Sequence, residues 1–318
     1  MLRIGVLGAG GHSNSSHGPA LEECRDARPG EVELAAVCDL DRQRAEQYAR
    51  RFGFERPYTD WHEMLEREAL DGLVAVTPIN LTVKLVSELL PRGVPLLIEK
   101  PPGMTSGEAR ALRDLAYSTG TPHMVSFNRR FSPAFVRAQD WLAQHATRPP
   151  ELVIARMLRI ERKEPDFVVG TAIHAVDTVL AVLGWPTQVE PSGKGASKGD
   201  RVYEAEVGFA SGACARLLIS PETAANEETY ETRGGQWDIH VDFARCRLLV
   251  FDGLETGLFW QAHQDALPAF VDGSIGETEA FLAALRGERE FTPDLEDGLA
   301  AMLVAEAIQE RRSVRIPL

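Results

Sequence analysis

Apolar and polar positions alternate in blocks along the first part of the chain. Short apolar runs predict strands, and between them lie longer segments in which apolar residues recur with helical period. The expected strands are Arg3–Leu7, Glu33–Cys38, Leu73–Val76, Pro95–Ile98 and His123–Phe127, and the expected helices are Asp41–Phe52, Asn80–Leu90 and Thr105–Tyr117. Repeated strand–helix–strand units of this kind predict an α/β fold that begins with a doubly wound parallel sheet, the Rossmann arrangement.

The pattern changes in the second part of the chain, where several apolar runs are typical of antiparallel strands. The expected elements are a helix at Pro133–Gln144, a strand at Leu152–Glu161, a helix at Thr171–Leu183, strands at Val202–Phe209, Ala213–Ile219, Gln236–Val241 and Arg247–Phe251, and helices at Glu277–Arg286 and Asp294–Glu310. Polar stretches at Glu190–Asp200 and Glu222–Arg233 are expected to be surface loops, the second a mobile one. The sequence therefore predicts a Rossmann domain over residues 1–123 and a sheet-rich α+β domain over 124–318.

Composition and charge narrow the class of protein. The length of 318 residues with 44% hydrophobic content suits two globular domains. The net charge of −13, from 34 basic and 47 acidic residues, disfavours nucleic acid or an anionic membrane as the main partner and favours a small molecule. The four cysteines are widely spaced and indicate neither a disulfide framework nor a metal site. No leader segment or membrane-spanning run is recognisable, which favours a cytoplasmic location.

A glycine-rich loop follows the first expected strand. It matches the G-x-G-x-x-G fingerprint at the first two glycines and has serine at the third, through Gly8, Gly10, Gly11, His12 and Ser13. Gly8 allows a tight turn and Gly10 lets backbone amides approach a pyrophosphate, so the loop is predicted to bind a dinucleotide. The helix after it is expected to start only at Pro19. A glycine turn that binds no nucleotide is the alternative.

An acidic residue ends the second expected strand. Asp39 is placed to accept hydrogen bonds from the adenosine ribose hydroxyls and to repel a 2′-phosphate, which favours NAD over NADP. Arg42 and Arg44 follow closely and provide either partners for a 2′-phosphate or a solvated helix face, so NADP stays open as an alternative cofactor. The alternative role of Asp39 is a turn or cap residue.

Two further motifs end strands of the predicted parallel sheet. Thr77 and Pro78 follow the third strand, and Glu99 and Lys100 follow the fourth, so all four are expected at the carboxyl edge where such sheets bind ligands. A lysine in this place is able to stabilise negative charge on a substrate oxygen during hydride transfer. A surface lysine in a proline turn is the alternative.

A histidine and an aspartate lie three residues apart on a helix of the second domain. His174 and Asp177 share a face with Gly170, and His174 is a candidate general acid and base because imidazole titrates near neutral pH. A structural histidine bonded to Asp177 is the alternative. A metal site is not expected, because no further ligand has suitable spacing. Arg129, Asp177 and Arg159 are candidate substrate-binding residues, with a solvated or interdomain role as the alternative for Arg129.

These motifs in this order resemble the glucose–fructose oxidoreductase and inositol dehydrogenase (Gfo/Idh/MocA) family, essentially over the full length. The resemblance rests on the glycine loop, Asp39, Thr77-Pro78, Glu99-Lys100-Pro101, the stretch Phe127–Pro133, the His174-x-x-Asp177 helix and the closing segment Phe281–Pro317. It implies that the second domain contains a large, mostly antiparallel open sheet, often paired in homodimers or homotetramers. It also implies NAD(P)-dependent oxidation or reduction of CH–OH groups in sugars, cyclitols and related polyols.

Carried over by position, Lys100 matches the family lysine and His174 the catalytic histidine. Two positions depart from the pattern, because Gly170 stands where many members have aspartate and Thr82 where many have histidine. The leading hypothesis is an NAD(H)-dependent dehydrogenase or reductase. The alternatives are NAD-dependent elimination or glycoside cleavage through transient oxidation, and a non-catalytic NAD-binding regulatory protein.

Overall fold

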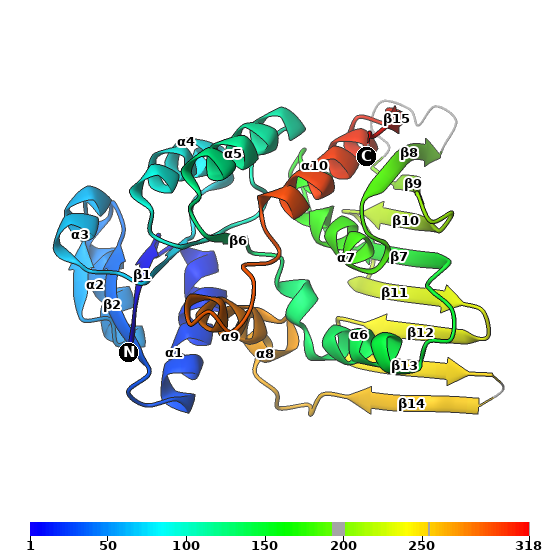
Figure 1. Cartoon of the computed structure of the whole chain (residues 1–318), viewed down its shortest axis with the longest axis horizontal. Coiled ribbons are helices and arrows are strands. Elements are labelled where there is room, and N and C mark those ends of the chain that lie inside the picture. The colour runs from blue at the N-terminus through cyan, green and yellow to red at the C-terminus, as the bar shows by residue number, and fades with distance from the viewer. Residues whose placement is uncertain (193–200, 254, 318) are drawn as a thin grey trace. The chain divides into compact units, whose positions relative to one another are not determined.

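The chain forms two compact units (Figure 1). The computed structural model describes residues 1–192, 201–253 and 255–317. One unit consists of Met1–Asn128 with Pro268–Leu299, and the other of Arg129–Leu267 with Ala300–Leu318. This division differs from the predicted ranges 1–123 and 124–318, since residues 268–299 return to the first unit. Helix α9 (Ser274–Leu285) packs there against α1 (Gly18–Ala27).

The first unit contains a six-stranded parallel sheet of order β3-β2-β1-β4-β5-β6. Its strands are β1 (Leu2–Leu7), β2 (Val32–Cys38), β3 (Arg56–Tyr58), β4 (Gly72–Ala75), β5 (Leu96–Ile98) and β6 (His123–Val125). Its other helices are α2 (Arg42–Phe52), α3 (Trp61–Arg67), α4 (Ile79–Leu89), α5 (Ser106–Thr119) and α8 (Pro268–Val271). The chain order reverses at β1, between β2 and β4, and such a switch point opens a ligand crevice at the carboxyl ends of the strands. The predicted Rossmann arrangement is confirmed.

The helix boundaries of this unit follow the punctuation in the sequence. Asp41 caps α2 by accepting hydrogen bonds from the backbone amides of Gln43 and Arg44. Thr105 caps α5, where its hydroxyl accepts from the Glu108 amide. Gly53 ends α2 and Gly120 ends α5, both in the left-handed conformation that glycine adopts without steric cost.

The second unit contains a nine-stranded, mostly antiparallel sheet of order β14-β13-β12-β11-β7-β10-β9-β8-β15, which confirms the predicted open sheet (Figure 1). Its strands are β7 (Leu152–Leu158), β8 (Pro186–Ser192), β9 (Tyr203–Phe209), β10 (Cys214–Ser220), β11 (Glu227–Gly234), β12 (Trp237–Asp242), β13 (Arg247–Asp252), β14 (Glu255–Gln261) and β15 (Val314–Arg315). Within this sheet β7 and β10 are parallel. Helix α6 (Pro133–His145) packs on β12 and β13, and α7 (Ile173–Leu183) packs on β7 and β10. Helix α10 (Leu295–Gln309) precedes β15.

Two loop predictions have different outcomes. The prediction of a mobile loop at Glu222–Arg233 is wrong, because most of this segment forms β11. That strand is paired with β7 on one side and with β12 on the other. Of the loop expected at Glu190–Asp200, the first residues end β8, and residues 193–200 lie outside the described part of the chain.

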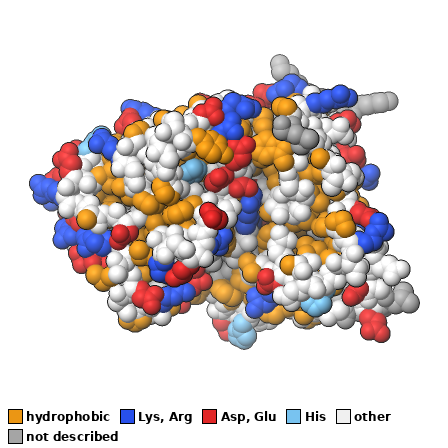
Figure 2. All heavy atoms as spheres, in the orientation of Figure 1, with side chains coloured by type: hydrophobic (Ala, Val, Ile, Leu, Met, Phe, Trp, Pro, Cys, Tyr) orange, Lys and Arg blue, Asp and Glu red, His pale blue; other side chains and the backbone are white. Residues whose placement is uncertain are grey.

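Charged side chains of both signs are mixed on the surface in view. On the face drawn in Figure 2, Lys and Arg side chains are interspersed with Asp and Glu side chains. Among the described residues, no helix combines the length and the apolar character that crossing a bilayer requires.

Candidate cofactor and active site

The glycine loop after β1 has the geometry of a dinucleotide-binding turn. Gly8 has a φ of +104°, and a Cβ added there would lie 1.8 Å from the carbonyl oxygen of Val76, so only glycine fits. A Cβ added at Gly10 or at Gly11 would meet no heavy atom within 4 Å among the described residues. The backbone is therefore open to a pyrophosphate at these two glycines, and the loop fits the predicted cofactor.

The sequence predicted that the helix after the loop begins at Pro19, but in the structure helical turns begin earlier. A π-helical turn, Ser13–His17, leads directly into α1. Ser13 is fully buried and its hydroxyl donates a hydrogen bond to the Tyr48 hydroxyl over 2.9 Å. A Cβ added at Gly18 would lie 2.4 Å from the Phe52 ring. Gly18 therefore lets the start of α1 pack closely against α2, a role that the sequence pattern did not single out.

Asp39 is joined to the glycine loop by its carboxylate. Its Oδ2 accepts a hydrogen bond from the Ala9 amide (2.9 Å) and its Oδ1 accepts one from the Asp41 amide (2.9 Å). The Arg44 guanidinium donates to the same Oδ1, with Nη2 at 2.8 Å and Nε at 3.1 Å. Arg42, in contrast, is well exposed and pairs with Glu46 one helical turn later. Asp39 therefore lies next to the glycine loop, where a carboxylate that binds the adenosine ribose is expected. Of the two nearby arginines, Arg44 is bound to it.

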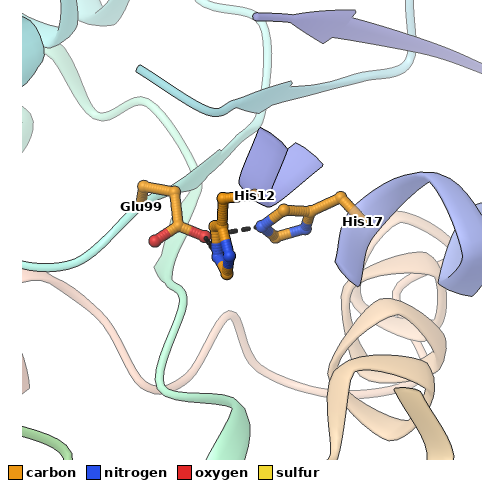
Figure 3. Close-up of side chains that lie close together, drawn as sticks. All are labelled: His12, His17 and Glu99. Carbon is orange, nitrogen blue, oxygen red and sulfur yellow. Dashed lines mark hydrogen bonds and ion pairs between the residues drawn. The ribbon is translucent and has the colours of Figure 1, made fainter. Parts of the chain in front are cut away.

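Glu99 and two histidines, of which His12 belongs to the glycine loop, form a compact cluster (Figure 3). The Nε2 atoms of His12 and His17 lie 3.0 Å and 2.6 Å from Oε1 of Glu99. Burial acts to raise the pKa of Glu99, but the hydrogen bonds from both imidazoles outweigh it and hold this pKa well below its usual range. The same hydrogen bond to Glu99 raises the pKa of His12. Sequence reasoning missed His17, because residues five apart share a side only across a π-helical turn.

The other predicted residues of the first unit lie at the carboxyl ends of β4 and β5. Lys100 follows β5, is partly exposed, and is joined to Pro101 by a cis peptide bond. Thr77 follows β4, and its hydroxyl lies 3.4 Å from the hydroxyl of Thr82, which is buried. Pro78 caps α4. The structure thus brings Gly8, Asp39, Thr77 and Lys100 to one edge of one sheet.

His174 belongs to the second unit, where it lies in the first turn of α7. A second π-helical turn, Val168–Ala172, precedes the helix and contains Gly170. His174 is 8% exposed, and the Asp177 side chain is fully buried. Arg130 donates to both carboxylate oxygens of Asp177, from Nη2 to Oδ1 over 2.7 Å and from Nε to Oδ2 over 3.0 Å. This enclosed ion pair anchors the helix that carries His174.

Arg129 and Arg159 converge on a carboxylate that the sequence did not single out. Both donate to Glu228, Arg129 from Nε to Oε1 over 3.0 Å and Arg159 from Nη2 to Oε2. The Glu228 side chain is only 5% exposed. Burial acts to raise its pKa, but the two arginines outweigh burial and lower this pKa. The two guanidinium groups therefore neutralise a buried carboxylate within the sheet domain.

Comparison with known proteins identifies the family. Residues 2–127 match the Gfo/Idh/MocA model, described as an oxidoreductase family with an NAD-binding Rossmann fold. The first unit therefore contains the NAD-binding Rossmann fold of the Gfo/Idh/MocA family. Over almost its whole length it is similar to inositol 2-dehydrogenase of Rhizobium meliloti strain 1021, at 24% identity over 339 residues and 99% of each chain. The family match confirms the predictions of an oxidoreductase and of NAD as cofactor.

Other relatives in this family extend the likeness. An inositol 2-dehydrogenase of Rubrobacter xylanophilus is 26% identical over 329 residues, covering 96% of this chain and 89% of its own length. The structure of a levoglucosan dehydrogenase in complex with NADH superposes with a TM-score of 0.84 at 20% identity, covering 99% of both chains. This structural likeness establishes the shared two-part fold.

Proposed function

We propose that this protein is an NAD(H)-dependent dehydrogenase or reductase that acts on a secondary alcohol or ketone of a sugar, cyclitol or related polyol. The observation that carries the proposal is the glycine loop, whose backbone is open at Gly10 and Gly11 and whose Ala9 amide is hydrogen-bonded to Asp39. The names of two relatives that match over nearly their full length, both inositol 2-dehydrogenases, support the substrate class.

The proposal assigns separate roles to two side chains. Bound NAD would supply the hydride acceptor for this chemistry. His174 takes the proton that leaves the substrate hydroxyl, and returns a proton when the ketone is reduced. Lys100 donates a hydrogen bond to the same substrate oxygen and stabilises the negative charge that develops on it. Asp177 acts as a positioning residue through the helix of His174, since its buried carboxylate is held by Arg130.

A substrate screen tests the proposed reaction. The protein is incubated with sugars, cyclitols and their keto forms, each with NAD(H) and with NADP(H), while nicotinamide absorbance and product identity are followed together. We expect stoichiometric NADH formation with at least one polyol. Product without net NADH would instead indicate elimination through transient oxidation, the reaction class that the glycine at position 170 leaves open. Cofactor binding with no turnover of any polyol would overturn the proposal.

Arg44 is expected to weaken the preference of the enzyme for NAD over NADP. Its guanidinium offsets the charge of Asp39, so Arg44→Ala should strengthen the repulsion between Asp39 and a 2′-phosphate. We expect kcat/KM for NADP to fall relative to that for NAD by roughly tenfold, the effect of one charge-assisted hydrogen bond. The measurement is the ratio of the two kcat/KM values. Arg42→Ala is the matched control and should leave the ratio unchanged; an equal change in both variants would contradict the role of Arg44.

A further inference from the structure

We propose that His12, His17 and Glu99 form a binding site for one divalent transition-metal ion of the zinc class. The sequence predicts no metal site here. One ligand atom from each side chain, a ring nitrogen of each histidine and a carboxylate oxygen, lies within 4.8 Å of the other two. The proposal concerns the first unit alone and does not depend on the proposed dehydrogenase reaction.

The π-helical turn is the local structure that builds the site. In a regular α-helix, residues five apart project about 140° away from each other, so His12 and His17 would diverge. With hydrogen bonds five residues apart, as in a π-helical turn, they share one side of the helix. Their ring centroids lie 5.5 Å apart and both rings present Nε2 to Glu99 (Figure 3). Such turns are rare and often mark functional sites.

The spacing of the ligand atoms suits a small ion. Bond lengths of about 2.0–2.2 Å in a tetrahedral zinc site place the ligand atoms about 3.4 Å apart. The two Nε2–Oε1 distances are 3.0 Å and 2.6 Å, so small side-chain rotations make room for the ion. Each imidazole would bind through the Nε2 lone pair with its proton on Nδ1. Two histidines and a glutamate are a known zinc ligand set that leaves a fourth position for water.

Burial and charge also favour a cation in this place. Glu99 is 6% exposed, and a buried carboxylate needs compensating charge or hydrogen bonds. The His17 side chain is 3% exposed and fixes the inner side of the site. The His12 side chain is 54% exposed, which gives an ion a path from solvent. Imidazole ligands select Zn²⁺, Co²⁺ or Ni²⁺ over Mg²⁺ and Ca²⁺, which prefer oxygen.

Titration with Co²⁺ alone tests the site. Full-length protein freed of cofactor is titrated with Co²⁺ while visible absorption is followed, and Zn²⁺ is then added to displace it. We expect one Co²⁺ per chain, with the intense visible bands of a tetrahedral protein site, and their loss on addition of Zn²⁺. The readout needs no turnover, so its failure leaves the proposed dehydrogenase untouched, and failure of the substrate screen leaves the metal site untouched.

Variants assign the ligands. His12→Ala changes an exposed side chain, so the variant should fold. Loss of a residue that only supports a metal ligand typically weakens metal binding ~10–100-fold, so loss of the ligand His12 itself should weaken Co²⁺ binding at least as much. Glu99→Gln keeps the shape but removes the charge and should weaken binding in the same way. His62→Ala, another exposed histidine of the first unit, is the matched control and should bind as the unmodified protein does. Absence of the bands, or equal binding by His12→Ala and the unmodified protein, would overturn the proposal.

Discussion

Replacing Lys100 by methionine should lower turnover by about 10²-fold or more, because the variant loses the hydrogen bond that stabilises charge on the substrate oxygen. Methionine keeps much of the length and apolar volume of the lysine side chain, so the loss reports the ammonium group itself. The affinity for NADH should change little, since the backbone of the glycine loop and Asp39 are expected to hold the cofactor. The measurements are kcat with the best substrate of the screen and the NADH dissociation constant.

His174→Ala should also lower turnover by about 10²-fold or more, because the reacting hydroxyl loses its proton acceptor. Two matched variants control for general effects of losing a lysine or a histidine. Lys84→Met removes an exposed lysine of the first unit, and His263→Ala removes a histidine whose side chain is 82% exposed in the second unit. Both controls should turn over normally. Normal turnover in Lys100→Met and His174→Ala as well would refute the assignment of the two residues.

The Rossmann unit could be predicted from sequence because its signals are local. Central parallel strands such as β4 and β5 are apolar runs, and helix ends carry caps such as Asp41 and Gly53. The motifs at the strand ends then follow from topology, since all parallel strands end at one edge. The return of residues 268–299 to this unit rests on packing between α1 and α9, which no local pattern encodes.

Strand β11 and the histidine–glutamate cluster were not predicted, because polar side chains or irregular turns interrupt the hydrophobic pattern there. Strand β11 alternates in burial like any half-buried strand, but Glu228 and Thr232 stand on its buried side, so apolar alternation is absent. The cluster of His12, His17 and Glu99 was hidden in a similar way, because a π-helical turn has no period that a sequence pattern shows. In both places a charged group is buried, and its partners come from distant segments.

Replacing Glu228 by alanine should destabilise the second unit strongly, because Arg129 and Arg159 would be left in a buried setting without their carboxylate. Breaking a buried ion pair by removing one partner typically costs about 3–5 kcal/mol. The matched control is Glu206→Ala, which removes an ion pair with Arg216 on the exposed side of the same sheet and should cost about 1 kcal/mol or less. A loss in Glu228→Ala no larger than the loss in this control would contradict a structural role for the cluster.

Urea unfolding followed by tryptophan fluorescence measures this loss, since four of the five tryptophans, Trp141, Trp185, Trp237 and Trp260, belong to the second unit. The midpoint should move down by about 1 M urea or more. Acid provides an independent check with a definite sign. The arginines lower the pKa of Glu228 in the folded state, so its contribution is complete above the ordinary carboxyl pKa and is lost as pH falls through the lowered one. Glu228→Gln should therefore lose less stability on acidification than the unmodified protein, because the amide that replaces the carboxylate takes up no proton there.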